Sequence, residues 1–214
     1  MAELQTRANP GDAVHQKRYH KVERIYLGLR VPDMTAIAKA AGKLFSEADL
    51  LRACRKLWAT DIHDARITTG KILHLKQISD QQAVWQFLDD VKNDLDAWAI
   101  ADALAQAAHR CLQTHPHFLD KLEADWVTHL NFWIRRAALV NTLYLAKSGQ
   151  NPARPLTWAA TYVPDREWFI QKAIAWWLRE LSKHNPKLVQ TFLDQHGQHM
   201  KGFARREAAK YLSA

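Results

Sequence analysis

A tryptophan and an aspartate lie one helical turn apart in the segment NDLDAWAIADALA, at Trp98 and Asp102. A carboxylate can stabilise an oxocarbenium-like cation, and it can also orient or deprotonate an attacking water. An aromatic ring beside it can stack on a sugar or on a cationic base. When the leaving base is itself cationic, as in an N3- or N7-alkylated purine, no general acid is needed and one carboxylate suffices. The pair therefore predicts cleavage of a glycosidic bond.

The pair interrupts a basic position that recurs every 34 to 36 residues. An Arg or Lys preceded three positions earlier by an aromatic ring occurs in HDAR, FWIRR, WFIQK and GFARR. In the second copy this position is Ala101, between Trp98 and Asp102. A repeat of about 35 residues made of two helices is typical of an α-solenoid. The recurring basic residues are Arg66, Arg136, Lys172 and Arg206.

Helical periodicity with short turns runs through most of the chain, and no segment alternates as a strand would. Start signals include Ser46, Asp61, Asp80, Asp94 or Asp96, Asn131, and Asp165 with Glu167. We expect an all-α fold, with residues 1–12 as a flexible tail, residues 13–214 as a single domain and 148–157 as a loop. The expected helices are 13–20, 32–44, 46–58, 61–77, 80–92, 96–114, 116–128, 131–147, 155–162, 165–184, 186–195 and 202–212.

Helical spacing separates the core face of each helix from the opposite face. In 96–114 the core stripe contains Ile100 and Leu104, and Trp98 and Asp102 lie opposite to it. In 165–184 the same reasoning places Trp177 in the core, whereas Lys172, Trp176 and Arg179 form a separate stripe. In the frame of the repeat, Trp98, Asp102, Arg136 and Trp176 project onto one surface, which in a solenoid is the concave one. The competing interpretation is that these tryptophans pack against a neighbouring helix.

The chain has 30 basic and 22 acidic side chains, a formal charge of +8, which favours a polyanionic partner such as nucleic acid over an acidic membrane surface. It contains no 18-residue apolar run and no signal-peptide h-region, so a cytosolic protein is expected. Cys54 and Cys111 lack CxxC spacing, and the histidine pairs lack the neighbouring ligands of a metal site. We therefore expect neither a metal nor a cofactor.

These residues lie in motifs that resemble the DNA alkylation repair glycosylases of the AlkD type. The resemblance covers about residues 16–212. Its motifs are KRYHKVERIYLGLRVPD, WAIAD, NFWIRRAA, EWFIQKAIAWWLRE and ARREAAKYL. The resemblance implies a superhelix of HEAT-like repeats with a basic concave face. It also implies a monomeric enzyme of the bacterial cytosol or nucleoid that excises N3- and N7-alkylpurines from double-stranded DNA in base excision repair.

The resemblance also assigns roles to individual residues. The catalytic carboxylate falls on Asp102, and the aromatic residues that flank the lesion fall on Trp98 and Trp176. A DNA-contacting arginine falls on Arg136 and an N-terminal tyrosine near the lesion on Tyr19. The family implies that the modified nucleotide is not flipped into a pocket, in contrast to the usual glycosylase route. The remaining expected DNA contacts are Arg66, Arg135, Lys172, Arg179 and Arg206.

Two other functions remain open at this stage. The chain could bind distorted or branched DNA without cleaving it, or it could be a scaffold whose basic face binds an acidic protein. Salt-dependent DNA binding separates the scaffold from the other two, and base release separates the enzyme from the DNA binder. The sequence leaves open whether the lesion carries a methyl group or a bulky adduct. It also leaves open whether Arg135 or Arg136 faces the groove.

Overall fold

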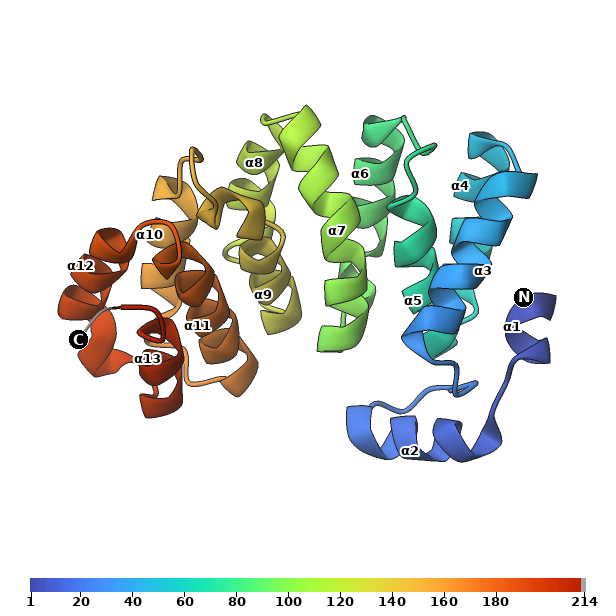
Figure 1. Ribbon diagram of the computed structural model, residues 1–214, viewed down its shortest axis with the longest axis horizontal. Helices are drawn as coiled ribbons and strands as arrows, with labels where there is room; N and C mark the ends of the chain where they lie inside the picture. Colours follow the sequence, from blue (N-terminus) through green and yellow to red (C-terminus); the bar gives the residue numbers. More distant parts are fainter. Residues whose placement is uncertain (213–214) are drawn as a thin grey trace. The chain divides into compact units, whose positions relative to one another are not determined.

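The computed structural model describes residues 1–212, and within them it contains helices but no β-sheet (Figure 1). This confirms the all-α prediction, and the twelve expected helices agree with the structure to within a few residues at most of their ends. In chain order the helices are α1 (Ala2–Thr6), α2 (Pro10–His20), α3 (Val31–Leu44), α4 (Glu47–Ala59), α5 (His63–Leu73), α6 (Gln81–Val91), α7 (Trp98–Thr114), α8 (Phe118–Lys121), α9 (Phe132–Val140), α10 (Ala153–Tyr162), α11 (Trp168–Ser182), α12 (Pro186–His196) and α13 (Gly202–Ala208).

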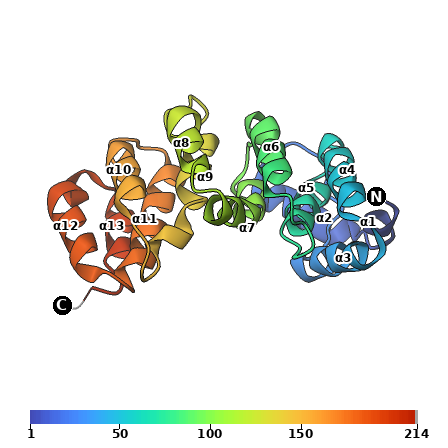
Figure 2. The same cartoon turned by 90° about the horizontal axis from the view of Figure 1, so that it is seen from above.

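The described chain forms two compact units, the first Met1–Pro116 and the second beginning at His117. In the first unit α3, α5 and α7 pack side by side, and α4 and α6 pack on α5 and α7. Figure 2 shows α4 above α3, and α6 above α7. In the second unit α9, α11 and α13 form the corresponding row, with α10 and α12 against α11. The sequence repeat of about 35 residues, on which the prediction of one domain over 13–214 is based, continues through both units.

Contacts between positions one period apart explain the repeat. In the first unit Trp58 Nε1 donates to Asp94 at 2.7 Å. In the second unit Tyr162 Oη donates to the carbonyl of Val127, 35 residues earlier, at 2.8 Å. Because equivalent residues of successive hairpins touch, the sequence period is a repeat of structure, as in an α-solenoid.

The predicted core stripes are buried. In α7 Ile100 is fully buried and Leu104 is 5% exposed. In α11 Trp177 is fully buried, whereas Trp176 beside it is partly exposed. Adjacent residues lie about 100° apart around a helix, so one indole enters the core while the other does not.

Some predicted helix starts are correct and others are wrong. Ser46, Asp80 and Asn131 accept hydrogen bonds from the first turns of α4, α6 and α9. Asp61, Asp94 and Asp96 do not cap helices, because their carboxylates pair with two buried arginines instead, Arg24 and Arg66. Glu167, rather than Asp165, caps α11.

The N-terminal segment differs from the predicted flexible tail 1–12. The structure has the short helix α1, in which Leu4 is 1% exposed. Leu4 lines an apolar cavity together with Ile37 and Leu50. Asn9 then caps α2 by accepting hydrogen bonds from Gly11 N and Asp12 N. A five-residue helix is too short to show an amphipathic period, so the sequence pattern did not reveal it.

Gly70 lets α5 and α7 approach each other closely. A Cβ atom at this position would overlap the carbonyl of Ala103, the residue after Asp102. We therefore expect Gly70→Ala to lower the free energy of unfolding by about 2 kcal/mol, despite the better helix propensity of alanine. Urea unfolding measures this change. The matched control is Gly197→Ala, where a Cβ would make only ordinary contacts, and an equal effect of both variants would contradict the explanation.

Candidate functional site

Three residues predicted for the site line one cavity of the first unit. Tyr19 of α2 and Trp98 and Asp102 of α7 surround a volume of about 480 Å³. Trp98 is the first residue of α7 and Asp102 follows one turn later, so both side chains leave the same face of the helix. The cavity is also lined by charged and titratable side chains that the sequence analysis did not assign to it, namely His20, Arg30, His63 and Lys71.

Helix α2 contributes to this cavity although none of its own residues is buried. It lies below the ends of α3 and α5 (Figure 1). The segment 21–30 holds it there, since Asn9 N donates to Leu27 O and Gln16 Nε2 donates to Leu29 O, both at 2.8 Å. Gly28 of this segment has φ of 80°, and a Cβ there would overlap the backbone of Asn9. The glycine in GLRVPD is thus required for the turn that positions α2.

Asp64 fixes the segment 21–30 to α5. Its side chain is fully buried, and its two carboxylate oxygens accept hydrogen bonds from Leu27 N and Leu29 N, each at 2.7 Å. Charge-assisted bonds of this kind are stronger than neutral ones. Asp64 thereby determines where Tyr19 and His20 lie, although it does not line the cavity itself.

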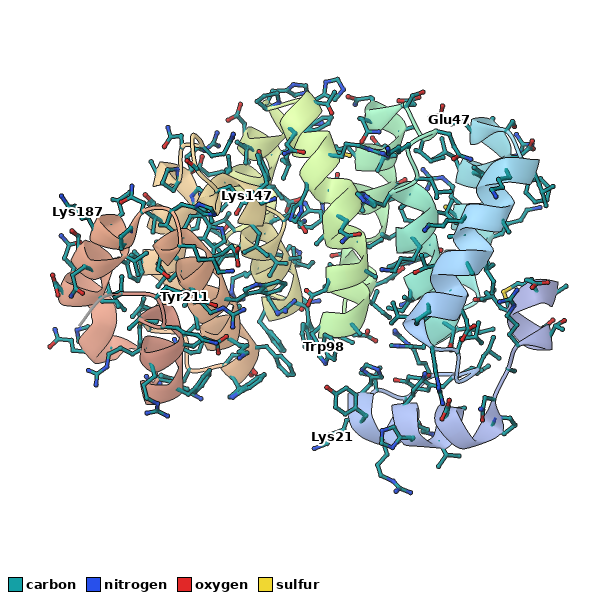
Figure 3. The ribbon with its side chains drawn as sticks, viewed as in Figure 1. Lys21, Glu47, Trp98, Lys147, Lys187 and Tyr211 are labelled. Carbon is teal, nitrogen blue, oxygen red and sulfur yellow. The ribbon has the colours of Figure 1, made fainter. Side chains whose placement is uncertain are left out.

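Aromatic rings support Trp98 from the side of α2. The Tyr19 ring meets the Trp98 ring edge-on, with centroids 6.2 Å apart and an interplanar angle of 85°. The His20 ring lies 5.4 Å from Trp98 and 4.5 Å from His63. Figure 3 shows Trp98 at the lower end of α7, near Lys21 at the end of α2. These contacts hold the indole in place beside Asp102.

Burial lowers the pKa of both histidines of the cluster. It lowers the pKa of His63 to about 3, and the positive charge of Arg24, together with that of His20 when it is protonated, acts in the same direction. Burial also lowers the pKa of His20, and the nearby Asp64 carboxylate opposes this shift. At neutral pH the His63 ring is neutral and lies tilted against the His20 ring at 36°, so the contact involves no repulsion between two charged imidazoles.

The low pKa of His63 predicts acid sensitivity. Below pH 6.5 the unfolded chain binds a proton that the folded chain does not, so stability is present above this pH and is lost towards pH 3. We expect His63 to lower the free energy of unfolding by about 2 kcal/mol at pH 5 relative to pH 7. Urea unfolding of wild type and His63→Phe at both pH values measures this. The variant has an aromatic ring that cannot bind a proton. If its stability depended on pH as the wild type's does, the assignment of this effect to His63 would be wrong.

Arg66, one of the predicted DNA contacts, is buried among partners within the first unit. It is 7% exposed, and its guanidinium pairs with Asp61 at 3.1 Å and lies over the Trp58 ring at 4.8 Å. Arg24, whose side chain is 2% exposed, shares Asp61 and also pairs with Asp96 at 2.6 Å. These contacts give Arg66 a structural role in joining the starts of α5 and α7, and a DNA contact by its buried guanidinium stays a prediction.

In the second unit, α11 presents the predicted stripe of Lys172, Trp176 and Arg179, all partly exposed. Glu207 of α13 pairs with Lys172 and, at 2.6 Å, with Arg179. Arg206 of α13 is exposed. A cavity of about 710 Å³ lies here and includes Lys172, Arg179 and Arg206 but not Trp176. Most of the basic residues that were predicted to contact DNA in the second unit therefore lie on α11 and α13.

The two adjacent arginines of α9 lie in different environments. Arg135 pairs with Asp165 at 2.7 Å and donates to the carbonyls of His129 and Leu130, which holds the loop before α9. Arg136 is buried, at 4% exposure. Both side chains are engaged within the folded chain, and a DNA contact by either stays a prediction.

The aromatic residue that precedes each basic position has a structural explanation in the second unit. Trp133 and Phe169 lie 4.6 Å apart, and Trp168 links Phe169 at 5.0 Å to Phe203 at 5.6 Å. These rings stand in the first turns of α9, α11 and α13, so they join successive repeats. The recurring aromatic is thus part of the repeat contact as well as a candidate ligand surface.

Metal-ligating clusters, cysteine thiols and membrane-spanning helices are three further features that bear on function. No group of three or more His, Cys, Asp or Glu side chains within residues 1–212 is arranged to hold a metal ion. Burial raises the pKa of the thiols of Cys54 and Cys111 to about 12, which suits small apolar core residues rather than nucleophiles. Across the same residues, every helix is too short or too polar for a membrane span.

Comparison with known proteins agrees with this architecture. A predicted DNA alkylation repair enzyme from Enterococcus faecalis superposes with a TM-score of 0.81 at 25% identity, over 96% of this chain and 97% of that one. AlkD2 from Streptococcus mutans superposes with a TM-score of 0.66 at 17% identity, over 94% and 98%, which shows a shared fold. No match was found among curated proteins. The model of the DNA alkylation repair enzyme family matches residues 1–212, and this chain therefore belongs to that family.

Proposed function

We propose that the chain is a DNA glycosylase that hydrolyses the N-glycosidic bond of cationic N3- and N7-alkylated purines in duplex DNA. Membership of the DNA alkylation repair enzyme family supports a role in DNA repair. The observation that carries the finer proposal is the cavity that Tyr19, Trp98 and Asp102 line together. Arg30 and Lys71 at the same cavity offer positive charge for the phosphates beside a lesion.

The proposed reaction needs no metal and no general acid. The C1′–N bond breaks, and its electron pair neutralises the positive charge of the alkylated base as that base leaves. The carboxylate of Asp102 stabilises the cationic sugar and accepts a proton from the water that bonds to C1′. The products are the free base and an abasic site. A neutral purine would have to leave as an anion, which is a poorer leaving group. The proposed preference for alkylated purines therefore comes from the leaving group, and it does not require a pocket shaped to the base.

Trp98 is proposed to hold the sugar of the damaged nucleotide. Its indole face would contact the deoxyribose through CH–π contacts and would attract the developing cation. The family resemblance assigns to Trp176 the role of a second aromatic residue that flanks the lesion. Lys172, Arg179 and Arg206 are further expected contacts to the DNA backbone. The base would remain stacked, and the protein would act as a monomer in base excision repair.

The test is the release of bases from methylated duplex DNA. Mass spectrometry of the supernatant is expected to find 7-methylguanine and 3-methyladenine, and the DNA is expected to acquire alkali-labile abasic sites. Salt-dependent binding to the same duplex without release of any base would overturn the proposal in favour of a non-catalytic DNA binder. The same assay on duplexes with N7 adducts of increasing size would show how large a lesion the protein can excise.

A further inference from the structure

The cavity between α11 and α13 of the second unit combines aromatic and charged side chains. It has a volume of about 710 Å³, and its wall combines two aromatic rings, those of Trp168 and Phe203, with several charged side chains. Four of these are cations and one is the carboxylate of Glu207, which leaves a net charge of +3 (four minus one). The cations are Lys172, Arg179, Arg206 and Lys210.

The four cations of the cavity wall differ in whether a carboxylate already neutralises them. Glu207, whose side chain is 17% exposed, pairs with both Lys172 and Arg179. Arg206 and Lys210 are exposed, and neither pairs with a carboxylate in the part of the chain that the structure describes. Both line the cavity, Arg206 from α13 and Lys210 from the turn that follows α13. No carboxylate of the described chain thus neutralises these two cations, and Lys210 Nζ also lies 5.6 Å from the centre of the Tyr211 ring.

Trp168 gives the cavity an exposed aromatic face. Its ring stacks on Phe203 with centroids 5.6 Å apart and an interplanar angle of 25°, and Phe169 meets it edge-on at 89°. The indole is nevertheless 47% exposed, unlike the buried Trp158 and Trp177 of the same unit. The ring is thus oriented by its neighbours while much of its surface remains in water.

We propose that the α11–α13 cavity binds one unpaired nucleotide of DNA, with the base stacked on Trp168 and the phosphate held by Arg206 and Lys210. An oriented aromatic face beside two cations that no carboxylate neutralises matches the two parts of a nucleotide. The base must be unpaired, because a base within a duplex has both faces covered by its neighbours. This inference rests on DNA binding by the chain, which belongs to the proposed function, but not on base release.

The stacking arm of the test uses two single-stranded probes of equal charge, a labelled thymidine decamer and a decamer of abasic sites. Fluorescence anisotropy is expected to show that the wild type prefers the thymidine decamer. Trp168→Leu is expected to weaken binding of that decamer about tenfold and to abolish the preference, whereas Trp168→Phe should retain most of it. Phe45→Leu, which replaces an aromatic residue 56% exposed in the first unit, is the matched control.

The phosphate arm measures how the affinity for the thymidine decamer depends on salt. Arg206→Gln and Lys210→Gln are each expected to reduce the slope of log K against log salt, by about 0.7 if one phosphate contact is lost. Trp168→Leu should leave the slope unchanged, and Lys187→Gln on α12 controls for loss of an exposed positive charge.

The inference is overturned if Trp168→Leu binds both decamers as the wild type does, or if the wild type does not distinguish them. Since neither probe contains an alkylated purine, a failure of base release leaves this result unaffected, and the reverse also holds. Circular dichroism of each variant confirms the fold, and the exposure of Trp168 and Arg206 makes unfolding by these substitutions unexpected.

Discussion

Asp102→Asn is expected to lower the rate of 7-methylguanine release by about a thousandfold. Asparagine keeps the size and shape of aspartate, but it has no negative charge for the cationic sugar and no basicity for the attacking water. The same substitution removes a negative charge from a cavity that also contains Arg30 and Lys71. Binding of undamaged duplex DNA should therefore be unchanged or slightly stronger.

This combination of slower chemistry and intact binding distinguishes a catalytic residue from a structural one. Single-turnover assays on methylated duplex, corrected for spontaneous depurination, measure the rate, and anisotropy measures the affinity. The control is Asp194→Asn on α12, a carboxylate that accepts a hydrogen bond from Gln190. Equal rates for wild type and Asp102→Asn would exclude the catalytic role.

Asp64→Ala is expected to lower the free energy of unfolding by about 4 kcal/mol. The substitution leaves Leu27 N and Leu29 N without their acceptor, and a hydrogen bond to a charged group contributes about 1.5–3 kcal/mol. Asp64→Asn should cost less, because its amide oxygen still accepts one of the two bonds. Urea unfolding measures the loss, with Asp33→Asn, a carboxylate 47% exposed, as a control expected to change little.

Loss of the Asp64 contacts should also affect the site. Hydrogen exchange at Leu27 and Leu29 is expected to accelerate in Asp64→Asn, because segment 21–30 then opens more easily. Tyr19 and His20 would lose their fixed position beside Trp98, so base release should fall even under conditions where the variant is folded. Normal exchange at both amides would show that Asp64 does not hold this segment.

Much of this arrangement follows from the sequence because it depends on local periodicity. A spacing of four residues places Trp98 and Asp102 on one side of a helix, and adjacency places Trp177 in the core and Trp176 outside it. The period of about 35 residues identifies the helical hairpins, since successive copies must bury equivalent faces. The family motifs add the assignment of roles, which periodicity alone does not supply.

The tertiary structure decided the properties that depend on distant residues. Arg66 and Arg206 occupy equivalent positions in the repeat, yet Arg66 is buried and pairs with Asp61 and Asp94, whereas Arg206 is exposed. His20 meets His63 only because Asp64 draws the connecting segment onto α5. Burial and ion pairing depend on which side chains meet in three dimensions, and a local pattern carries no information about partners tens of residues away.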